Sequence, residues 1–165
     1  GAALVHPYED PMVMAGQGTA CLELLADVPK LDAVLAPVGG GGLLAGTAIA
    51  LGNTPVVLYG VEPDGAADTA ASLRAGERLT QFVPNTLCDG LRTLVGVPNF
   101  EIIRQRVRQV LVVTDAQCVA AQQLAAEHLD MVIESSSGTV LAVVLAYPEF
   151  FAGKQVGLIL TGGNV

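Results

Sequence analysis

The sequence predicts an α/β fold in three layers, with a mostly parallel sheet between two layers of helices. Apolar runs at 33–38, 56–61, 110–113 and 156–160 alternate with longer segments of helical character, as in folds built from repeated strand–helix units. These runs are continuously apolar, which is typical of parallel strands covered on both faces. We therefore expect residues 1–165 to form a single α/β domain.

The first helix is expected to begin at Thr19, its N-cap, and to end near Ala26, after an irregular segment at 1–14. The pairs His6-Pro7 and Asp10-Pro11 in that segment are turn signals. Further helices are expected at 43–51, 66–75 and 100–108.

The second half of the chain carries clearer boundaries. Thr114 and Gln117 have the spacing of a capping box, which predicts a helix that ends near Leu129. A short strand is expected at 131–134. The serines at 135–137 then cap a last helix, which ends before Pro148.

The composition excludes some classes of partner. The chain has 16 acidic and 8 basic residues, a formal net charge of −8, which argues against nucleic acid or an anionic membrane surface. The three cysteines, Cys21, Cys88 and Cys118, are widely spaced and form no zinc-binding pattern, so we interpret them as buried, reduced thiols of a cytoplasmic protein. The first residues do not show a basic region followed by an apolar region, so we do not expect a signal peptide in this sequence.

One uncharged stretch needs a separate interpretation. Residues 33–61 carry no charge, but prolines 37 and 55 and the glycines between them interrupt the stretch. Each half is shorter than the roughly 20 residues that a membrane span requires. We therefore do not expect a transmembrane helix.

A tract of four glycines, Gly39, Gly40, Gly41 and Gly42, joins the first predicted strand to the helix at 43–51. Backbone N–H groups in such a turn, together with the positive end of the helix dipole, form a binding site for phosphate. The alternative is a tight strand–helix turn that binds nothing. Because ligands bind at the carboxyl ends of parallel strands, we expect the tract to share one site with Glu62, Glu134 and Thr161, which end other predicted strands.

Six segments of the chain occur together in a characteristic order. They are Ala15-Gly16-Gln17-Gly18-Thr19, Gly39–Gly42, Val61-Glu62-Pro63, Asp89-Gly90, Ile133-Glu134 and Thr161-Gly162-Gly163-Asn164-Val165. In this order they resemble serine/threonine dehydratases and serine racemases, which are pyridoxal-phosphate (PLP) enzymes of the tryptophan-synthase-β fold type. The resemblance covers nearly the whole chain.

The resemblance implies roles for individual residues. The glycine tract and the amide of Leu43 would hold the PLP phosphate. Thr161 stands where the family places a hydroxyl against the pyridine nitrogen, whereas Gly90 and Glu134 would lie near the ring. An ordinary strand-end cap at Thr161, an Asp-Gly turn at Gly90 and a solvated carboxylate at Glu134 are the simpler interpretations.

Glu62, Ala66 and Asp68 match the spacing of a divalent-cation site in the racemase-like members. Two carboxylates and a backbone carbonyl suit Mg²⁺ or a similar hard cation. The simpler interpretation is a surface helix whose first turn is acidic because of the helix dipole.

The resemblance also implies that part of the enzyme is missing. The family's Schiff-base lysine lies upstream of the segment that resembles this chain, and neither Lys30 nor Lys154 matches it. We expect a partial chain that lacks the N-terminal small domain and is inactive alone. Its exposed apolar surface should lead to a homodimer or to association with the missing domain.

The predicted function of the complete enzyme is conversion of serine or threonine to a 2-oxo acid and ammonia, or racemisation. Two other interpretations remain open. Gly40, Gly42 and Ala45 fit a relaxed dinucleotide-binding pattern, with Glu62 as the ribose-binding acid. The second interpretation is a truncated or non-catalytic relative of an enzyme, which binds a phosphorylated metabolite.

Overall fold

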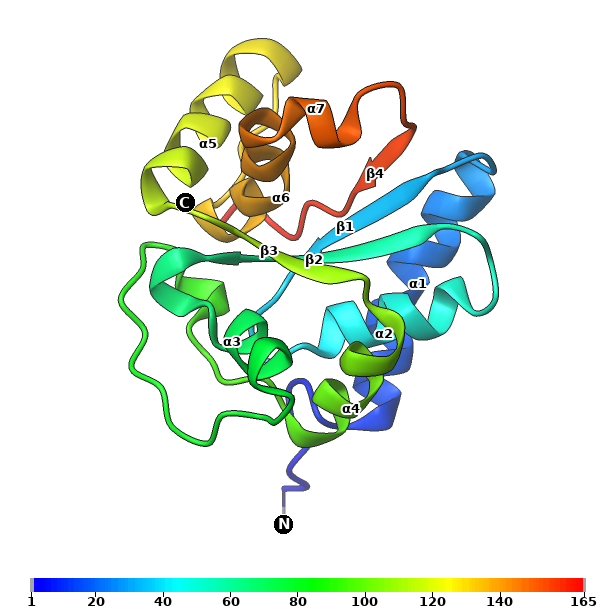
Figure 1. Ribbon diagram of the computed structural model, residues 1–165, viewed down its shortest axis with the longest axis vertical. Coiled ribbons are helices and arrows are strands. Elements are labelled where there is room, and N and C mark those ends of the chain that lie inside the picture. The colour runs from blue at the N-terminus through cyan, green and yellow to red at the C-terminus, as the bar shows by residue number, and fades with distance from the viewer. Residues whose placement is uncertain (1, 165) are drawn as a thin grey trace.

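A computed structural model describes residues 2–164, and it contains one four-stranded sheet (Figure 1). The strand order is β3-β2-β1-β4, and every pair of neighbouring strands is parallel. The strands are β1 (Ala33–Pro37), β2 (Val57–Pro63), β3 (Gln109–Val113) and β4 (Val156–Leu158). A parallel sheet brings all of its carboxyl ends to the same edge, and that edge holds the site described below.

Helices cover both faces of the sheet, which confirms the predicted fold class (Figure 1). One layer contains α1, α2 and α4, and the other contains α5, α6 and the short α7. The helices are α1 (Pro11–Asp27), α2 (Gly42–Leu51), α3 (Asp68–Ala75), α4 (Val97–Arg106), α5 (Asp115–Leu129), α6 (Ser135–Ala146) and α7 (Pro148–Phe151), with 3-10 turns at Asp64–Ala66 and Asp89–Leu91.

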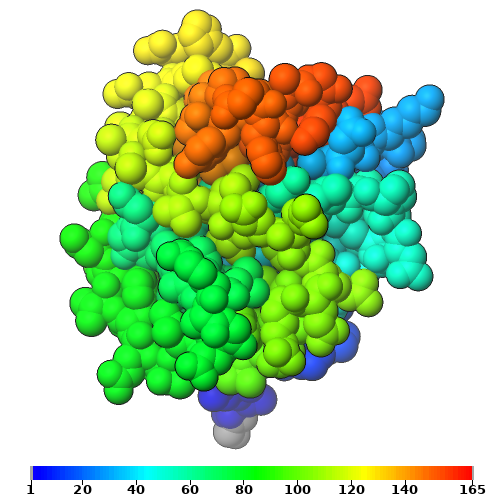
Figure 2. Space-filling model, in the orientation of Figure 1, coloured from blue at the N-terminus to red at the C-terminus, as the bar shows by residue number. Residues whose placement is uncertain are grey.

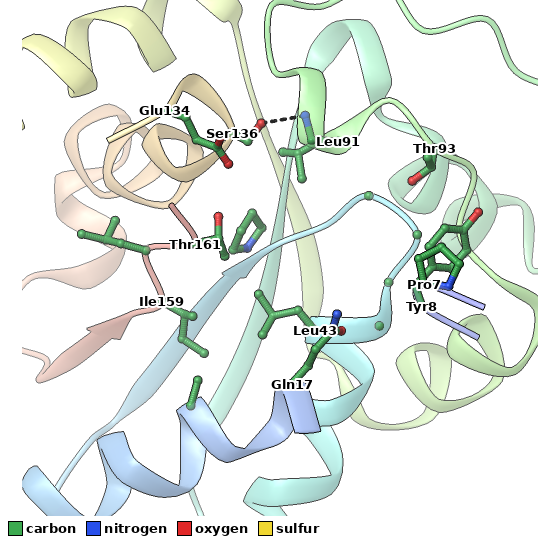
Figure 3. Close-up of a pocket in the computed structure, with 18 of the residues that line it drawn as sticks. Pro7, Tyr8, Gln17, Leu43, Leu91, Thr93, Glu134, Ser136, Ile159 and Thr161 are labelled. Carbon is green, nitrogen blue, oxygen red and sulfur yellow. Dashed lines mark hydrogen bonds between the residues drawn. The ribbon is translucent and has the colours of Figure 1, made fainter. Parts of the chain in front are cut away.

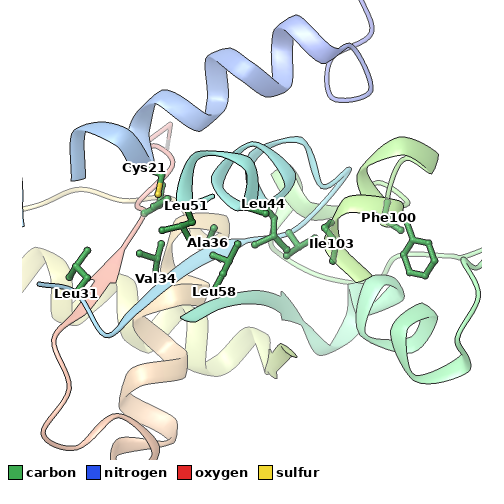
Figure 4. Close-up of a cluster of buried hydrophobic side chains, with 13 residues drawn as sticks. Cys21, Leu31, Val34, Ala36, Leu44, Leu51, Leu58, Phe100 and Ile103 are labelled. Atoms are coloured by element: carbon green, nitrogen blue, oxygen red, sulfur yellow. The ribbon is translucent and has the colours of Figure 1, made fainter. Parts of the chain in front are cut away.

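The central strand β1 contributes to both hydrophobic cores. Successive side chains of a strand point to opposite faces, so Val34 and Ala36 pack in the core beneath α1, α2 and α4 (Figure 4). Ala33 and Leu35 pack on the other side, against α5–α7. Every residue of β1 is buried, which explains why this strand is apolar throughout.

Helix α1 begins earlier than the sequence predicted. It starts at Pro11, and its N-cap is Asp10, whose carboxylate accepts a hydrogen bond from the N–H of Met12 at 2.8 Å. The expected N-cap, Thr19, lies inside the helix, where its hydroxyl donates to the Gly16 carbonyl. The pair Asp10-Pro11 therefore starts a helix, because a proline at the first helical position loses no hydrogen bond there.

The layer of α1 and α2 is held together by close contact between two glycines. A Cβ at Gly18 would lie 2.6 Å from the Gly46 carbonyl oxygen, and a Cβ at Gly46 would overlap the backbone of α1 at Met14. The two helices thus pack backbone against backbone, as only glycine permits.

The remaining differences are smaller. The strand expected at 131–134 does not form, since this segment is extended chain that leads to α6. The N-cap residue of α6 is Glu134, whereas the sequence predicts that the serines at 135–137 cap this helix. The capping box of Thr114 and Gln117 is confirmed at the start of α5.

The surface view shows the chain between α3 and α4 (green) along the lower part of the visible face, with α6 and α7 (orange) above it (Figure 2). That connecting segment carries no regular element apart from the turn at Asp89–Leu91. Within residues 2–164, none of the helices has the length and apolar character of a membrane-crossing segment.

Candidate active site

A cavity of about 630 Å³ lies at the carboxyl ends of the strands (Figure 3). The glycine tract and Tyr8 form one side of it, and Thr161 and Glu134 face them from the other. All eight residues predicted to contact a cofactor line this cavity: Gly39, Gly40, Gly41, Gly42, Leu43, Gly90, Glu134 and Thr161. The fold thus brings together segments that lie far apart in the sequence.

The glycine loop, residues 39–42, presents free backbone donors to the cavity. Gly41 is the N-cap of α2 and has a left-handed backbone with φ of 84°, which favours glycine. The first protein hydrogen bond of the helix runs from the N–H of Ala45 to the Gly41 carbonyl, at 2.9 Å. The N–H groups of residues 39–43 donate to no protein acceptor in the part of the chain that the structure describes. These donors, at a helix N-terminus, suit an anion.

The glycines are also required by space. A Cβ at Gly40 would overlap the ring of Tyr8, and one at Gly42 would lie 2.5 Å from Oε1 of Gln17. A Cβ at Gly39 would lie 3.0 Å from the Gly90 carbonyl oxygen. The loop is therefore packed closely on its neighbours wherever it does not border the cavity.

Ser137 holds the opposite wall in place. Its buried Oγ accepts hydrogen bonds from the N–H groups of Thr161 at 2.7 Å and of Gly162 at 2.8 Å. It also donates to the Gly162 carbonyl at 3.0 Å and lies 3.1 Å from Oγ1 of Thr161. The two lone pairs and the proton of Ser137 are thus all used, which leaves the Thr161 hydroxyl proton free for an acceptor in the cavity.

Gly90 is positioned by α6. Its N–H donates to Oγ of Ser136 at 3.0 Å, which ties the Asp89–Leu91 turn to the first turn of that helix (Figure 3). The N–H of Glu134 donates to the Gly162 carbonyl at 3.0 Å. The Glu134 carboxylate approaches both glycines: its Oε1 lies 3.8 Å from where a Cβ of Gly90 would be and 3.5 Å from that of Gly162.

Glu62 does not join this cavity, contrary to the sequence prediction that it shares the site. It is fully buried, and its carboxylate accepts hydrogen bonds from the N–H groups of Thr69 and Ala70, both at 2.9 Å. It therefore caps the start of α3 from inside the protein. Burial raises the pKa of the Glu62 carboxyl to about 7, against these hydrogen bonds, and the Asp68 carboxylate adds to the rise.

Asp68 is the second buried carboxylate at this place. Its Oδ2 accepts from the N–H of Val95 at 3.0 Å, whereas its Oδ1 is buried without a hydrogen-bond partner in residues 2–164. Burial raises the pKa of Asp68 as well. No group of three or more His, Cys, Asp or Glu side chains in the described residues has metal-binding geometry. A cation here would need a backbone oxygen such as that of Ala66, in the turn before α3.

The two lysines lie at the other edge of the sheet. Lys30 precedes β1 and Lys154 precedes β4, so both are near the amino ends of parallel strands, whereas the cavity is at the carboxyl ends. The Nζ of Lys154 donates to the Phe150 carbonyl at 2.7 Å. Neither lysine lines the cavity.

All three cysteines are buried, as the sequence predicts, and none forms a disulfide bond in the described residues. Cys88 and Cys118 belong to the same core cluster. A hydrogen bond with Cys88, together with burial, raises the pKa of the Cys118 thiol.

Sequence reasoning missed several residues of the site. The sequence predicts Ser136 and Ser137 to be helix caps, whereas in the structure their hydroxyls accept hydrogen bonds from the N–H groups of Gly90 and Thr161. Tyr8 and Gln17 line the cavity from the segment before α1 and from α1 itself. For Ser136 and Ser137, the local signal in the sequence is the run of three serines directly after Glu134.

Comparison with known proteins relates nearly the whole chain to one family of enzymes. The family described as "Pyridoxal-phosphate dependent enzyme" matches residues 1–162. A β-hydroxyaspartate dehydratase of Paracoccus denitrificans (strain Pd 1222) is 43% identical over 167 aligned residues, which cover 100% of this chain and 53% of that protein. The chain thus spans about half the length of the curated relatives that it matches.

Solved structures agree with that result. The structure of maize serine racemase has a TM-score of 0.95 at 37% identity, and the match covers 100% of this chain and 53% of the other. For a threonine deaminase from T.th. the TM-score is 0.93 at 43% identity, with coverage of 100% and 63%.

Proposed function

Because this chain belongs to the family of pyridoxal-phosphate-dependent enzymes, we propose that its cavity binds PLP with the phosphate on the glycine loop. The observation that carries the proposal is the row of backbone N–H groups at residues 39–43 that donate to no protein acceptor within residues 2–164. An amide nest at a helix N-terminus binds an anion without a positively charged side chain. This fits a chain whose net charge is −8.

The ring of the cofactor is assigned to the opposite wall. We propose that the Thr161 hydroxyl faces the pyridine nitrogen, with Gly90 and Glu134 near the ring. Support comes from the saturated hydrogen bonding of Ser137, which leaves the Thr161 proton available. A hydroxyl does not force the ring nitrogen to stay protonated, which suits elimination of a β-hydroxyl group.

The proposed reaction converts a β-hydroxy amino acid such as serine or threonine to a 2-oxo acid and ammonia, or racemises the same substrate. The water lost when the β-hydroxyl group leaves is taken up again when the product is hydrolysed, so that ammonia alone is released in net terms. When bound, PLP supplies an electron sink for charge at the substrate's α-carbon. Three similar proteins are named a hydroxyaspartate dehydratase, a threonine deaminase and a serine racemase. Elimination of a β-hydroxyl group and racemisation would both begin with removal of a proton from the α-carbon.

We propose that the lysine that would link PLP covalently to the protein lies outside residues 2–164. The cavity wall contains no lysine among residues 2–164, and both lysines of the chain lie at the far edge of the sheet. We propose that a further domain, or an associated subunit, contributes this amine and covers the open side of the cavity. Alone, the chain would bind PLP without turning over substrate.

A divalent cation is proposed beside this site, held by Glu62, Asp68 and the Ala66 carbonyl. Two neighbouring buried carboxylates repel each other, and Oδ1 of Asp68 is left without a partner in the described part of the chain. A hard cation such as Mg²⁺ would satisfy that oxygen and neutralise the repulsion. Its role would be to hold the start of α3 and, through Val95, the chain that leads to α4.

A titration with PLP tests the main proposal. Quenching of PLP fluorescence is measured for the chain, for Gly41→Asp, and for Gly76→Asp as a control. Gly76 also has a left-handed backbone but stands in open space outside the cavity. Saturable binding that survives only in the wild type and the control supports a phosphate site on the glycine loop.

Two results would overturn it. Equal binding by all three proteins would place PLP elsewhere, and an absence of binding by all three would refute cofactor binding by this chain. Protection from thermal unfolding by NAD, with none by PLP, would favour the dinucleotide-binding interpretation.

A further inference from the structure

Asn99 lies behind the glycine loop, outside the lining of the cavity. It is fully buried near the start of α4, and its Nδ2 donates to the carbonyl oxygens of Gly40 at 2.6 Å and of Tyr8 at 2.9 Å. Because both partners are carbonyl oxygens, only the NH₂ end of the amide can face them. One side chain thus ties α4 to the glycine loop and to the segment before α1.

The bond to Gly40 fixes the direction of a peptide unit. The described residues contain no cis peptide bond, and in a trans peptide the C=O and the following N–H point in opposite directions. The Gly40 oxygen faces α4, where the N–H of Gly96 also donates to it at 2.9 Å. The N–H of Gly41 therefore points away from α4, toward the side on which the loop borders the cavity.

We propose that Asn99 is a positioning residue that keeps the Gly41 N–H directed into the cavity for the phosphate. The inference rests on the proposed function, since phosphate is the group it concerns. With glycine on both sides of the peptide bond, the backbone itself offers little resistance to a flip of this unit. A flipped peptide would turn the Gly40 oxygen, with its partial negative charge, toward the anion.

The other end of the Asn99 amide supports this role. Its Oδ1 is buried and has no hydrogen-bond partner in residues 2–164. A buried polar atom without a partner is unfavourable for stability. An apolar residue of the same size would avoid that loss but would also lose both donated hydrogen bonds. The two contacts of Nδ2 are thus the part of Asn99 that has a structural use.

The test compares Asn99→Leu with Asn53→Leu. Leucine has nearly the shape of asparagine but cannot donate a hydrogen bond, and Asn53 is an exposed asparagine beyond the other end of α2. We expect the Kd for PLP to rise about tenfold or more in Asn99→Leu, as for loss of a buried hydrogen bond, and to stay within about twofold in Asn53→Leu. Asn99→Ala, which adds no volume, repeats the measurement should leucine disturb folding.

A second readout needs no ligand. ¹⁵N relaxation order parameters of Gly40, Gly41 and Gly42 are expected to fall in Asn99→Leu, whereas those of β1 and β2 stay unchanged. A merely structural role would lower the order parameters of the strands as well, together with the midpoint of unfolding.

The outcomes separate the two proposals. Failure of the wild type to bind PLP would refute the proposed function, and the order parameters of the loop would then decide the role of Asn99. Binding by the wild type with unchanged affinity in both Asn99 variants would overturn the inference alone. A loop that stays as rigid in Asn99→Leu as in the wild type would also overturn it.

Discussion

Replacement of Gly41 by alanine should destabilise the protein more than the same replacement at Gly76. Both glycines have left-handed backbones, with φ of 84° and 78°, so each alanine incurs the same penalty of about 1–2 kcal/mol. The surroundings differ. A Cβ at Gly76 meets nothing within 4 Å, whereas one at Gly41 would lie 3.0 Å from Ile103 and Val95 and 3.1 Å from Asn99.

The crowding at Gly41 adds a second penalty. Three buried side chains would have to shift, and overpacking of this kind costs about 1–3 kcal/mol. We therefore expect Gly76→Ala to lower the free energy of unfolding by about 1–2 kcal/mol and Gly41→Ala by about 2–5 kcal/mol.

Urea unfolding followed by far-UV circular dichroism measures both values, and it suits a chain without tryptophan. Equal losses in the two variants would mean that the loop moves freely away from α4. The argument that the loop is held by packing from behind would then be wrong.

Three further predictions concern the packing around the site. Gly46→Ala should destabilise by about 1–3 kcal/mol because its Cβ would overlap α1, whereas Gly16→Ala, with open space around it, should stabilise by about 0.5–1 kcal/mol in urea unfolding. Ser137→Ala should lower stability by about 1–3 kcal/mol and weaken PLP binding, since Thr161 and Gly162 lose their acceptor; an effect no larger than that of Ser135→Ala would contradict this. Mg²⁺ should raise the unfolding temperature of the wild type but not of Asp68→Asn, and an equal rise in both would refute the cation site.

Much of the fold could be predicted because its signals are local. The apolar strands, the glycine tract and the capping box at Thr114 each identify their element without information from elsewhere in the chain. The resemblance to serine/threonine dehydratases and serine racemases is confirmed at the level of the family. The cavity then follows from the topology, because parallel strands bring Gly39–Gly42 and Thr161 to one edge.

The errors arose where tertiary packing decides the outcome. Gly16 and Gly18 lower helix propensity, yet α1 passes through both because Gly18 packs against Gly46. Glu62 lies at the carboxyl end of a strand, as predicted, within the last two residues of β2, but its carboxylate binds the N–H groups at the start of α3 and does not line the cavity. The roles of Ser137 and Asn99 depend on partners 24 and 59 positions away, which no local pattern contains.

The two walls of the cavity are attached to strands that differ in how extensively they are paired with their neighbours in the sheet. The glycine loop continues β1, which is paired along both of its edges, to β2 over five residues and to β4 over three. Thr161 follows β4, a three-residue strand at the edge of the sheet. We therefore expect local opening to begin on the Thr161 side and the amides of β1 to resist exchange until the whole domain unfolds. Under mild denaturant the phosphate cradle should outlast the wall that faces it, so the site is lost in two steps.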